Sequence, residues 1–200
     1  MGMRRFLVVV SLSLASAASA CEADPPQDPT VPRPKSGDWL ARHEALNARV
    51  RQGHVDLIFL GDSITAGWEN EGKDVWDTHF APLHAVNLGI GGDRTQNVLW
   101  RLDNGNIAGI RPKLAVVMIG TNNSDRNTPE EIAAGVTAIV RKLRQKLLTT
   151  RVLLLGIFPR GANNDDPRRQ VNAATNAIIA NLDDGNMITY LDIGPEFVAI

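Results

Sequence analysis

The amino-acid sequence predicts one α/β domain, a three-layer α/β/α sandwich built on a five-stranded parallel sheet. Five short apolar runs alternate with segments whose apolar residues recur every three or four positions, which is the pattern of parallel strands joined by crossover helices. Three of these runs end in polar, mostly glycine-containing segments, as strands do at the ligand-binding edge of such a sheet. The 200 residues, 44% hydrophobic and 22% charged, are enough for one domain with a sizeable core.

Residues 1–20 have the order of an export signal and are not expected to belong to the domain. Two arginines precede the apolar stretch 6–14, and small residues follow, ending in Ala-Ser-Ala at 18–20. The apolar stretch is too short to span a membrane permanently. We therefore expect an exported protein, either a periplasmic or cell-envelope lipoprotein or a secreted protein.

Cys21 is the only cysteine and directly follows the predicted cleavage site. In that position it resembles a lipidation site that would tether the protein to a membrane. The alternative is plain secretion with an unmodified thiol, and a single cysteine excludes an intrachain disulfide. Residues 21–37 are rich in proline and predict an extended, solvated tether, so that the domain would cover residues 38–200.

The first half of the domain contains a helix, a strand, a second strand and a second helix. Apolar residues at helical spacing predict the helix over 38–53, with Asp38 as its cap. The run 55–60 is apolar except for one aspartate and predicts a buried parallel strand. A shorter apolar run predicts a strand at 85–88, and helical spacing returns at 95–102.

The second half continues the alternation. An apolar run predicts the third strand at 114–119. A threonine, a proline and a glutamate form a capping box for a helix at 128–147. The fourth strand is expected at 152–157, and an aspartate followed by proline opens a helix at 166–182. The fifth strand is expected at 187–191, which gives a flavodoxin-like sheet that lacks its last helix.

The segments 61–63, 91–93 and 120–123 each follow a predicted strand: Gly-Asp-Ser, Gly-Gly-Asp and Gly-Thr-Asn-Asn. Because the carboxyl ends of parallel strands lie at one edge of a sheet, these segments are expected to converge. Together they contain what acyl transfer requires. Ser63 Oγ would be the nucleophile, and the backbone N–H groups of Ser63 and Gly92 and the Asn122 side-chain amide would bind the oxyanion.

Four neighbouring residues are candidates for substrate binding: Asp62, Asp93, Arg94 and Asn123. Arg94, like Arg160, could contact a substrate carboxylate or pair with a neighbouring carboxylate. Each segment also has a simpler interpretation, since Asp-Ser after a strand can be a helix cap and Asn-Asn a turn. The glycine segment lacks the P-loop Gly-Lys-Ser/Thr and the full dinucleotide-binding spacing, which argues against a nucleotide site.

These segments resemble the conserved blocks of the SGNH, or GDSL-type, hydrolases. Residues 61–65 match the block with the serine, 87–93 the block with the glycine, and 120–123 the block with the asparagine. The residues of these segments are most similar to those of the branch that contains the platelet-activating-factor acetylhydrolase catalytic subunits. The resemblance covers about residues 39–197 and implies a serine esterase without metal or cofactor, acting on short acyl groups, often acetyl esters of sugars or lipids. It also makes a homodimer conceivable, and it implies a structural role for Asp62.

The family's fourth block, Asp-x-x-His, is absent, since all four histidines precede Asn122. His54 and His84 come directly before strands, and a six-residue strand places His54 about 20 Å from Ser63. His79 is in a loop, and the fourth histidine is in the first helix. We therefore expect the base beyond residue 200 and a nearly inactive 200-residue chain. The alternative is a non-catalytic module that binds an acylated glycan or lipid.

Composition argues against other partners. The net charge is −1 and no cluster of Lys or Arg is present, which gives no support for a nucleic-acid partner. Aromatic residues make up 5% of the chain, too few for a broad surface that stacks bases or sugars. The expected partner is a small acyl ester.

Overall fold

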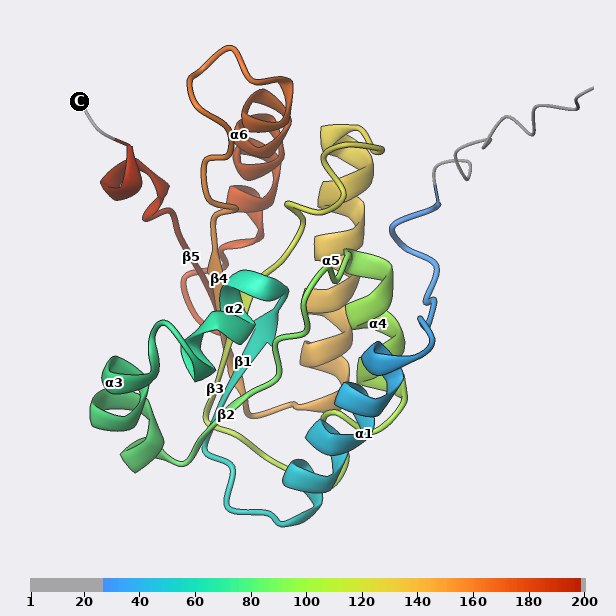
Figure 1. Cartoon of the computed structure of the whole chain (residues 1–200), viewed down its shortest axis with the longest axis vertical. Coiled ribbons are helices and arrows are strands. Elements are labelled where there is room, and N and C mark those ends of the chain that lie inside the picture. The colour runs from blue at the N-terminus through green and yellow to red at the C-terminus, as the bar shows by residue number, and fades with distance from the viewer. Residues whose placement is uncertain (1–26, 199–200) are drawn as a thin grey trace, which may run out of the picture.

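The protein is described by a computed structural model over residues 27–198, so the predicted export signal and Cys21 lie outside the described residues. Five parallel strands form one sheet in the order β2-β1-β3-β4-β5, which confirms the predicted parallel sheet and its flavodoxin-like order (Figure 1). The strands are β1 (Leu57–Gly61), β2 (Ala85–Asn87), β3 (Leu114–Met118), β4 (Arg151–Leu155) and β5 (Ile188–Leu191).

The helices follow the predicted alternation with strands, with short additional turns after β1. The α-helices are α1 (Asp38–Arg51), α2 (Ser63–Ala66), α3 (Lys73–Val75), α4 (Thr95–Asp103), α5 (Pro129–Lys146) and α6 (Pro167–Ile179). Shorter helical turns are η1 (Gly67–Glu69), η2 (Trp76–Phe80), η3 (Ala81–Leu83), η4 (Ala180–Leu182) and η5 (Gly194–Phe197). None of the helices within residues 27–198 is long and apolar enough to cross a bilayer.

Two of the three predicted helix caps are present. Thr128 and Glu131 form the capping box of α5, and the Asp166 carboxylate accepts a hydrogen bond from the Arg168 N–H at the start of α6. The prediction for α1 was wrong. Gly37 is its N-cap, with φ +64°, and Asp38 is its first residue and makes no capping bond. An acidic residue in the first turn still interacts favourably with the helix dipole.

One face of the sheet holds the main core. Alternate side chains of the central strands, such as Ile58, Val117 and Leu154, are buried against α1, α4, α5 and α6. The arrangement follows from the period of two along a strand, which sends successive side chains to opposite faces. In Figure 1 these four helices lie on one side of the sheet.

The other face is covered over only part of its width. Phe59 and Val116 pack beneath Trp76 and Phe80 from the turns between β1 and β2. At the far edge of this face Leu191 is 45% exposed. Within residues 27–198, the second layer therefore covers β1 and its neighbours and leaves β5 open.

The segment 27–37 lies along α4 rather than free in solvent. The Arg33 N–H donates to the Gln96 carbonyl at 3.0 Å, and Thr95 Oγ1 donates to the Pro29 carbonyl at 2.9 Å. Residues 30–34 are nonetheless exposed, and the proline-rich tether over residues 21–37 stays a prediction. Proline has no N–H to donate, but its carbonyl is a good acceptor for a side chain at the start of a helix.

Candidate active site

Ser63 lies where β1 passes directly into α2. The Asp62 side chain caps this short helix by accepting a hydrogen bond from the Ile64 N–H at 3.0 Å. Ser63 is the first helical residue and its side chain is exposed. The turn therefore presents a hydroxyl to solvent at the carboxyl end of the sheet, the edge where ligands bind in open α/β folds.

Two glycines allow α2 to pack directly on the strand ends. A Cβ on Gly61 would lie 2.1 Å from Thr65 Oγ1, and a Cβ on Gly89 would lie 2.4 Å from the Ala66 nitrogen. The Asn87 side chain joins the same elements, since it donates to the Thr65 carbonyl and accepts from the Gly89 N–H, both at 2.8 Å. The loop after β2 is thus fixed against the turn that carries the serine.

Two side chains join the loop after β2 to the loop after β3. Asn122 Nδ2 donates to the Asp93 carbonyl at 2.9 Å, and Arg94 Nε donates to the Asn122 carbonyl at 2.9 Å. Gly92, which directly precedes Asp93, is exposed and has φ +71°. This is a left-handed conformation that glycine adopts without steric cost. The two loops that carry Gly92 and Asn122 are therefore joined by hydrogen bonds.

The order of the strands brings the three loops together. β1 lies between β2 and β3 in the sheet, so the loops after these strands are neighbours. The chain passes from β1 to β2 on one side and then returns past β1 to β3 on the other. The site therefore lies at the topological switch point of the sheet, where a crevice forms in open α/β folds.

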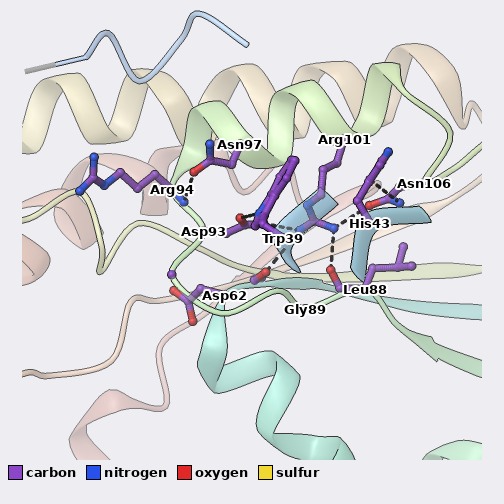
Figure 2. A network of polar contacts seen from close by, with 12 residues as sticks. Trp39, His43, Asp62, Leu88, Gly89, Asp93, Arg94, Asn97, Arg101 and Asn106 are labelled. Carbon is purple, nitrogen blue, oxygen red and sulfur yellow. Dashed lines mark hydrogen bonds and ion pairs between the residues drawn. The ribbon is translucent and has the colours of Figure 1, made fainter. Parts of the chain in front are cut away.

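A buried arginine lies beneath these loops (Figure 2). Arg101, on α4, is fully buried. It donates to the Leu88 carbonyl at 2.7 Å and to the Gly61 carbonyl at 3.4 Å, and it pairs with the Asp93 carboxylate at 2.8 Å. One side chain thus contacts the residue before Asp62 and both ends of the glycine loop.

The network continues toward α1. Trp39 Nε1 donates to the Asp93 carboxylate at 2.5 Å, and Arg101 also donates to Asn106 Oδ1 at 2.6 Å. His43 lies behind them, fully buried, with its Nε2 2.9 Å from the Asn104 carbonyl. Burial lowers the pKa of His43, so this histidine is a neutral structural residue of the core.

Burial changes the acidity of the two aspartates in the site. It raises the pKa of Asp62 to about 6, and the hydrogen bond from the Ile64 N–H offsets this only in part. Burial also raises the pKa of Asp93, although Arg101 and the Trp39 N–H act in the opposite direction. Asp93 and Arg101 thus form an ion pair in the interior. Burial disfavours both charges, and the attraction between them favours both.

Three of the predicted substrate-binding residues do not reach the surface. Asp62, Asp93 and Asn123 are 1%, 0% and 0% exposed. Asn123 accepts from the Thr95 N–H at 3.1 Å and donates to Gln96 Oε1 at 3.2 Å. The polar atoms of these three residues hold the loops in place. Their burial does not match the prediction that they contact the substrate.

Arg94 is half-buried and remains at the edge of the site. Two other cations also contact the loops. Lys35 Nζ donates to the Gly92 carbonyl at 2.6 Å, and Arg160 Nη1 donates to the Thr121 carbonyl at 3.0 Å.

Sequence reasoning missed Lys35, because it lies in a segment with no periodicity. It also missed the role of Arg101, although a lone arginine within the apolar stretch Val-Leu-Trp-Arg-Leu was a usable signal, since an unpaired charge is costly in a core.

Three of the four histidines lie away from Ser63, as predicted: His43 in the core, and His54 and His84 before their strands. His84 Nδ1 is 3.0 Å from the Asp56 carboxylate, and the His54 ring lies beside it, with ring centroids 6.3 Å apart. Both precede strands and so lie at the amino edge of the sheet. His79, whose position the sequence left open, lies in the helical turn η2 and is exposed.

A mostly apolar cavity of about 710 Å³ lies at the same edge of the sheet but farther along it. It is formed by α6 and the segments after β4 and β5, including Ile157, Ala177, Tyr190 and Pro195. The three loops around Ser63 do not line it. Asn172 lines the cavity and donates to Thr121 Oγ1 at 3.4 Å, so the cavity borders the loop after β3.

Known proteins resemble this chain in sequence and in fold. The model of the GDSL-like lipase/acylhydrolase family matches residues 59–199. The alpha1 subunit of human platelet-activating factor acetylhydrolase IB is 38% identical over 180 residues, which cover 88% of this chain and 76% of that protein. The alpha2 subunit from Rattus norvegicus is 37% identical, with 88% and 77% covered.

Solved structures share the fold at lower identity. A GDSL-like lipase from Bacteroides thetaiotaomicron superposes with a TM-score of 0.60 at 20% identity and covers 80% of each chain. A catalytic mutant of an acetylxylan esterase from Geobacillus stearothermophilus gives a TM-score of 0.55 at 20% identity, with 68% of this chain and 74% of that chain covered. On the match of the family model and the identity to these relatives, the chain belongs to the GDSL-like lipase/acylhydrolase family.

Proposed function

We propose that the protein is a serine esterase that cleaves short acyl, and in particular acetyl, esters of a carbohydrate or lipid. Ser63 Oγ attacks the ester carbonyl, the alcohol leaves with a proton, and water then releases the acyl group from Ser63 as a carboxylic acid. The observation that carries the proposal is that the exposed Ser63 adjoins the hydrogen-bonded loops with Gly92 and Asn122. The names of the relatives, platelet-activating factor acetylhydrolase and acetylxylan esterase, favour acetyl esters.

The oxyanion would be bound by three donors: the N–H groups of Ser63 and Gly92 and the amide of Asn122. An amide NH₂ has two hydrogens, and the bond from Asn122 to the Asp93 carbonyl, at 2.9 Å, uses one. The second is available for the substrate, and the first fixes its direction. Donors held in place before the reaction need no reorganisation when the negative charge develops, which is the source of their catalytic effect.

Deprotonation of Ser63 needs a base, and among residues 27–198 none of the four histidines is hydrogen-bonded to Ser63. His43 is buried in the core, and His84 is bound to Asp56. This observation favours a second candidate for the 200-residue chain, which is binding of an acyl ester without turnover. The two candidates differ in whether the ester is cleaved and not in the site that they use.

Hydrolysis of p-nitrophenyl acetate by the protein made from the complete reading frame tests the esterase proposal. Ser63→Ala should lower kcat by at least about a thousandfold, whereas Ser36→Ala, at an exposed serine before α1, should leave it unchanged. Equal activity of Ser63→Ala and the native protein would refute the assignment. Binding of the ester without release of p-nitrophenol would support the non-catalytic alternative.

We also propose that the protein is exported and lipidated at Cys21, because the cysteine follows an export-signal pattern. Labelling of cells with a radioactive fatty acid tests this. The native protein should carry the label in the membrane fraction, and Cys21→Ser should not. A native protein that is unlabelled and found in the culture medium would indicate plain secretion.

A further inference from the structure

The segment before α1, residues 27–37, is bound to the domain through its backbone. Both backbone groups of Arg33 are bonded to α4. The Arg33 N–H donates to the Gln96 carbonyl at 3.0 Å, and the Arg33 carbonyl accepts from Asn97 Nδ2 at 2.9 Å. In Figure 1 this segment, drawn in blue, runs beside α4. The contact with the helix therefore fixes the path of the chain on its way into α1.

The helix α5 has a glycine, Gly135, where the same segment passes. The Pro29 carbonyl accepts from Thr95 Oγ1 at 2.9 Å, and a Cβ on Gly135 would lie 2.9 Å from that carbonyl oxygen and 2.6 Å from Thr95 Oγ1. Glycine in the interior of a helix is less stable than alanine. At this position the absence of a side chain leaves room for the segment, so the surface of α5 fits it.

Lys35 follows this bound stretch and reaches the glycine loop after β2. Its Nζ donates to the Gly92 carbonyl at 2.6 Å and lies 4.0 Å from the Asp93 carboxylate. A proline stands on each side of Arg33, and proline restricts the backbone because its ring fixes φ. The bonds of Arg33 to α4 and the stiffness of the neighbouring prolines therefore determine where Lys35 lies.

The glycine loop needs support from outside to keep one conformation. The Asp93 N–H donates to the Ile90 carbonyl at 3.2 Å and closes a turn with two glycines at its centre, of which Gly92 has φ +71°. Consecutive glycines have many accessible conformations, so fixing them has a large entropic cost. Among residues 27–198, the Gly92 N–H makes no hydrogen bond, which leaves it free to bind an oxyanion.

Two consecutive carbonyls at the end of this loop are bound by different parts of the chain. Lys35 binds the Gly92 carbonyl, and Asn122 Nδ2 binds the Asp93 carbonyl at 2.9 Å. The peptide group between Gly92 and Asp93 is therefore fixed on both sides, because its N–H is bonded to the Ile90 carbonyl. Lys35 thus supplies the contact that holds this peptide from the side of the segment before α1.

We propose that Lys35 is a positioning residue for the esterase reaction. It holds the glycine loop in the conformation in which the Gly92 N–H binds the oxyanion, and residues 29–35 thereby become part of the active site. The inference rests on the esterase function proposed above. Lys35 acts through the Gly92 carbonyl and does not touch the reacting atoms. Because a donor that is already in place needs no reorganisation as the negative charge develops, loss of this bond slows the chemical step more than it weakens substrate binding.

Hydrolysis of p-nitrophenyl acetate by the protein made from the complete reading frame tests the proposal. Lys35→Met keeps a long unbranched side chain but has no donor. It should lower kcat by about ten- to a hundredfold, with KM within about twofold of the native value. Lys35→Arg keeps a donor and should retain most of kcat. A native kcat in Lys35→Met, or a loss in Lys35→Arg as large as in Lys35→Met, would overturn the proposal.

Two controls separate positioning from a general loss of stability. Lys113→Met removes an exposed lysine at the amino edge of the sheet and should leave kcat unchanged. The urea midpoint of Lys35→Met should match that of the native protein, because the lost bond orders an exposed loop and not the core. An equal loss of kcat in Lys113→Met, or a loss of kcat in Lys35→Met explained by a lower urea midpoint, would contradict the positioning role.

Hydrogen exchange keeps the inference testable if the esterase function fails. The peptide that covers residues 88–95 contains the bonded N–H groups of Ile90 and Asp93, and Lys35→Met should exchange several-fold faster in this peptide. Lys113→Met should not. Faster exchange in Lys35→Met would support the role of Lys35 in holding the loop even if the native protein hydrolysed no ester. Hydrolysis by the native protein, with native exchange and native kcat in Lys35→Met, would refute the role of Lys35 and leave the esterase function intact.

Discussion

At the scale of single residues, the site depends on groups whose conformation is fixed before substrate binds. The Asn122 amide is held by the Asp93 carbonyl, and the Asn122 carbonyl is held by Arg94. Gly92 adopts a left-handed conformation that a side chain would strain. The proposed oxyanion donors are thus few, and the neighbouring residues orient them.

Replacement of Asn122 tests the proposed oxyanion donor. We expect Asn122→Ala to lower kcat for p-nitrophenyl acetate by about a hundred- to a thousandfold, with a smaller change in KM, because the amide acts mainly in the transition state. Steady-state kinetics on the protein from the complete reading frame measures this. A change in KM alone would show that Asn122 binds the ground state and the transition state equally.

The charge of Asp62 should lower stability at neutral pH. Its pKa in the folded protein is about 6, above its ordinary value of 3.8, so the folded state binds more protons than the unfolded state between these values. The free energy of unfolding therefore falls as the pH rises from about 4 to about 6, by at most about 3 kcal/mol.

Asp62→Asn isolates this effect, because asparagine caps a helix as well as aspartate does. The stability of the variant relative to the native protein should rise between pH 4 and pH 7. Urea unfolding at several pH values measures the difference. A difference that stays constant over this range would mean that Asp62 titrates normally in the folded protein.

At the scale of secondary-structure elements, α4 fixes the two loops through Arg101. This side chain contacts the Gly61 and Leu88 carbonyls and the Asp93 carboxylate. The pattern of the sequence predicts α4 because its apolar residues recur at helical spacing. It does not predict the contacts of Arg101, because they join residues that are distant in the chain and depend on how the helix packs.

Loss of Arg101 should cost more stability than loss of a surface arginine. Arg101→Met leaves the Asp93 carboxylate buried without its cation, which typically costs about 3–5 kcal/mol. The double variant Asp93→Asn with Arg101→Met removes the unpaired charge and should recover part of this loss. Urea unfolding measures both, and a single variant as stable as the native protein would contradict the buried pair.

At the scale of the whole molecule, the sheet order explains why the site forms. The parallel strands and crossover helices follow from the alternation of apolar runs and helical spacing, and the sequence places the three polar segments at the strand ends. Two features depend on tertiary contacts and are not visible in the sequence. These are the docking of residues 27–37 along α4 and the contacts of Lys35, Arg94 and Arg160 with the loops around Ser63.

The central claim is that Ser63 is the nucleophile, and covalent labelling tests it most directly. The protein from the complete reading frame is treated with a fluorophosphonate, which reacts with activated serines, and the modified peptide is mapped by mass spectrometry. We predict a single modification on Ser63 that is absent in Ser63→Ala and accompanies loss of p-nitrophenyl acetate hydrolysis. Modification of another residue, or hydrolysis that survives complete labelling of Ser63, would contradict the account.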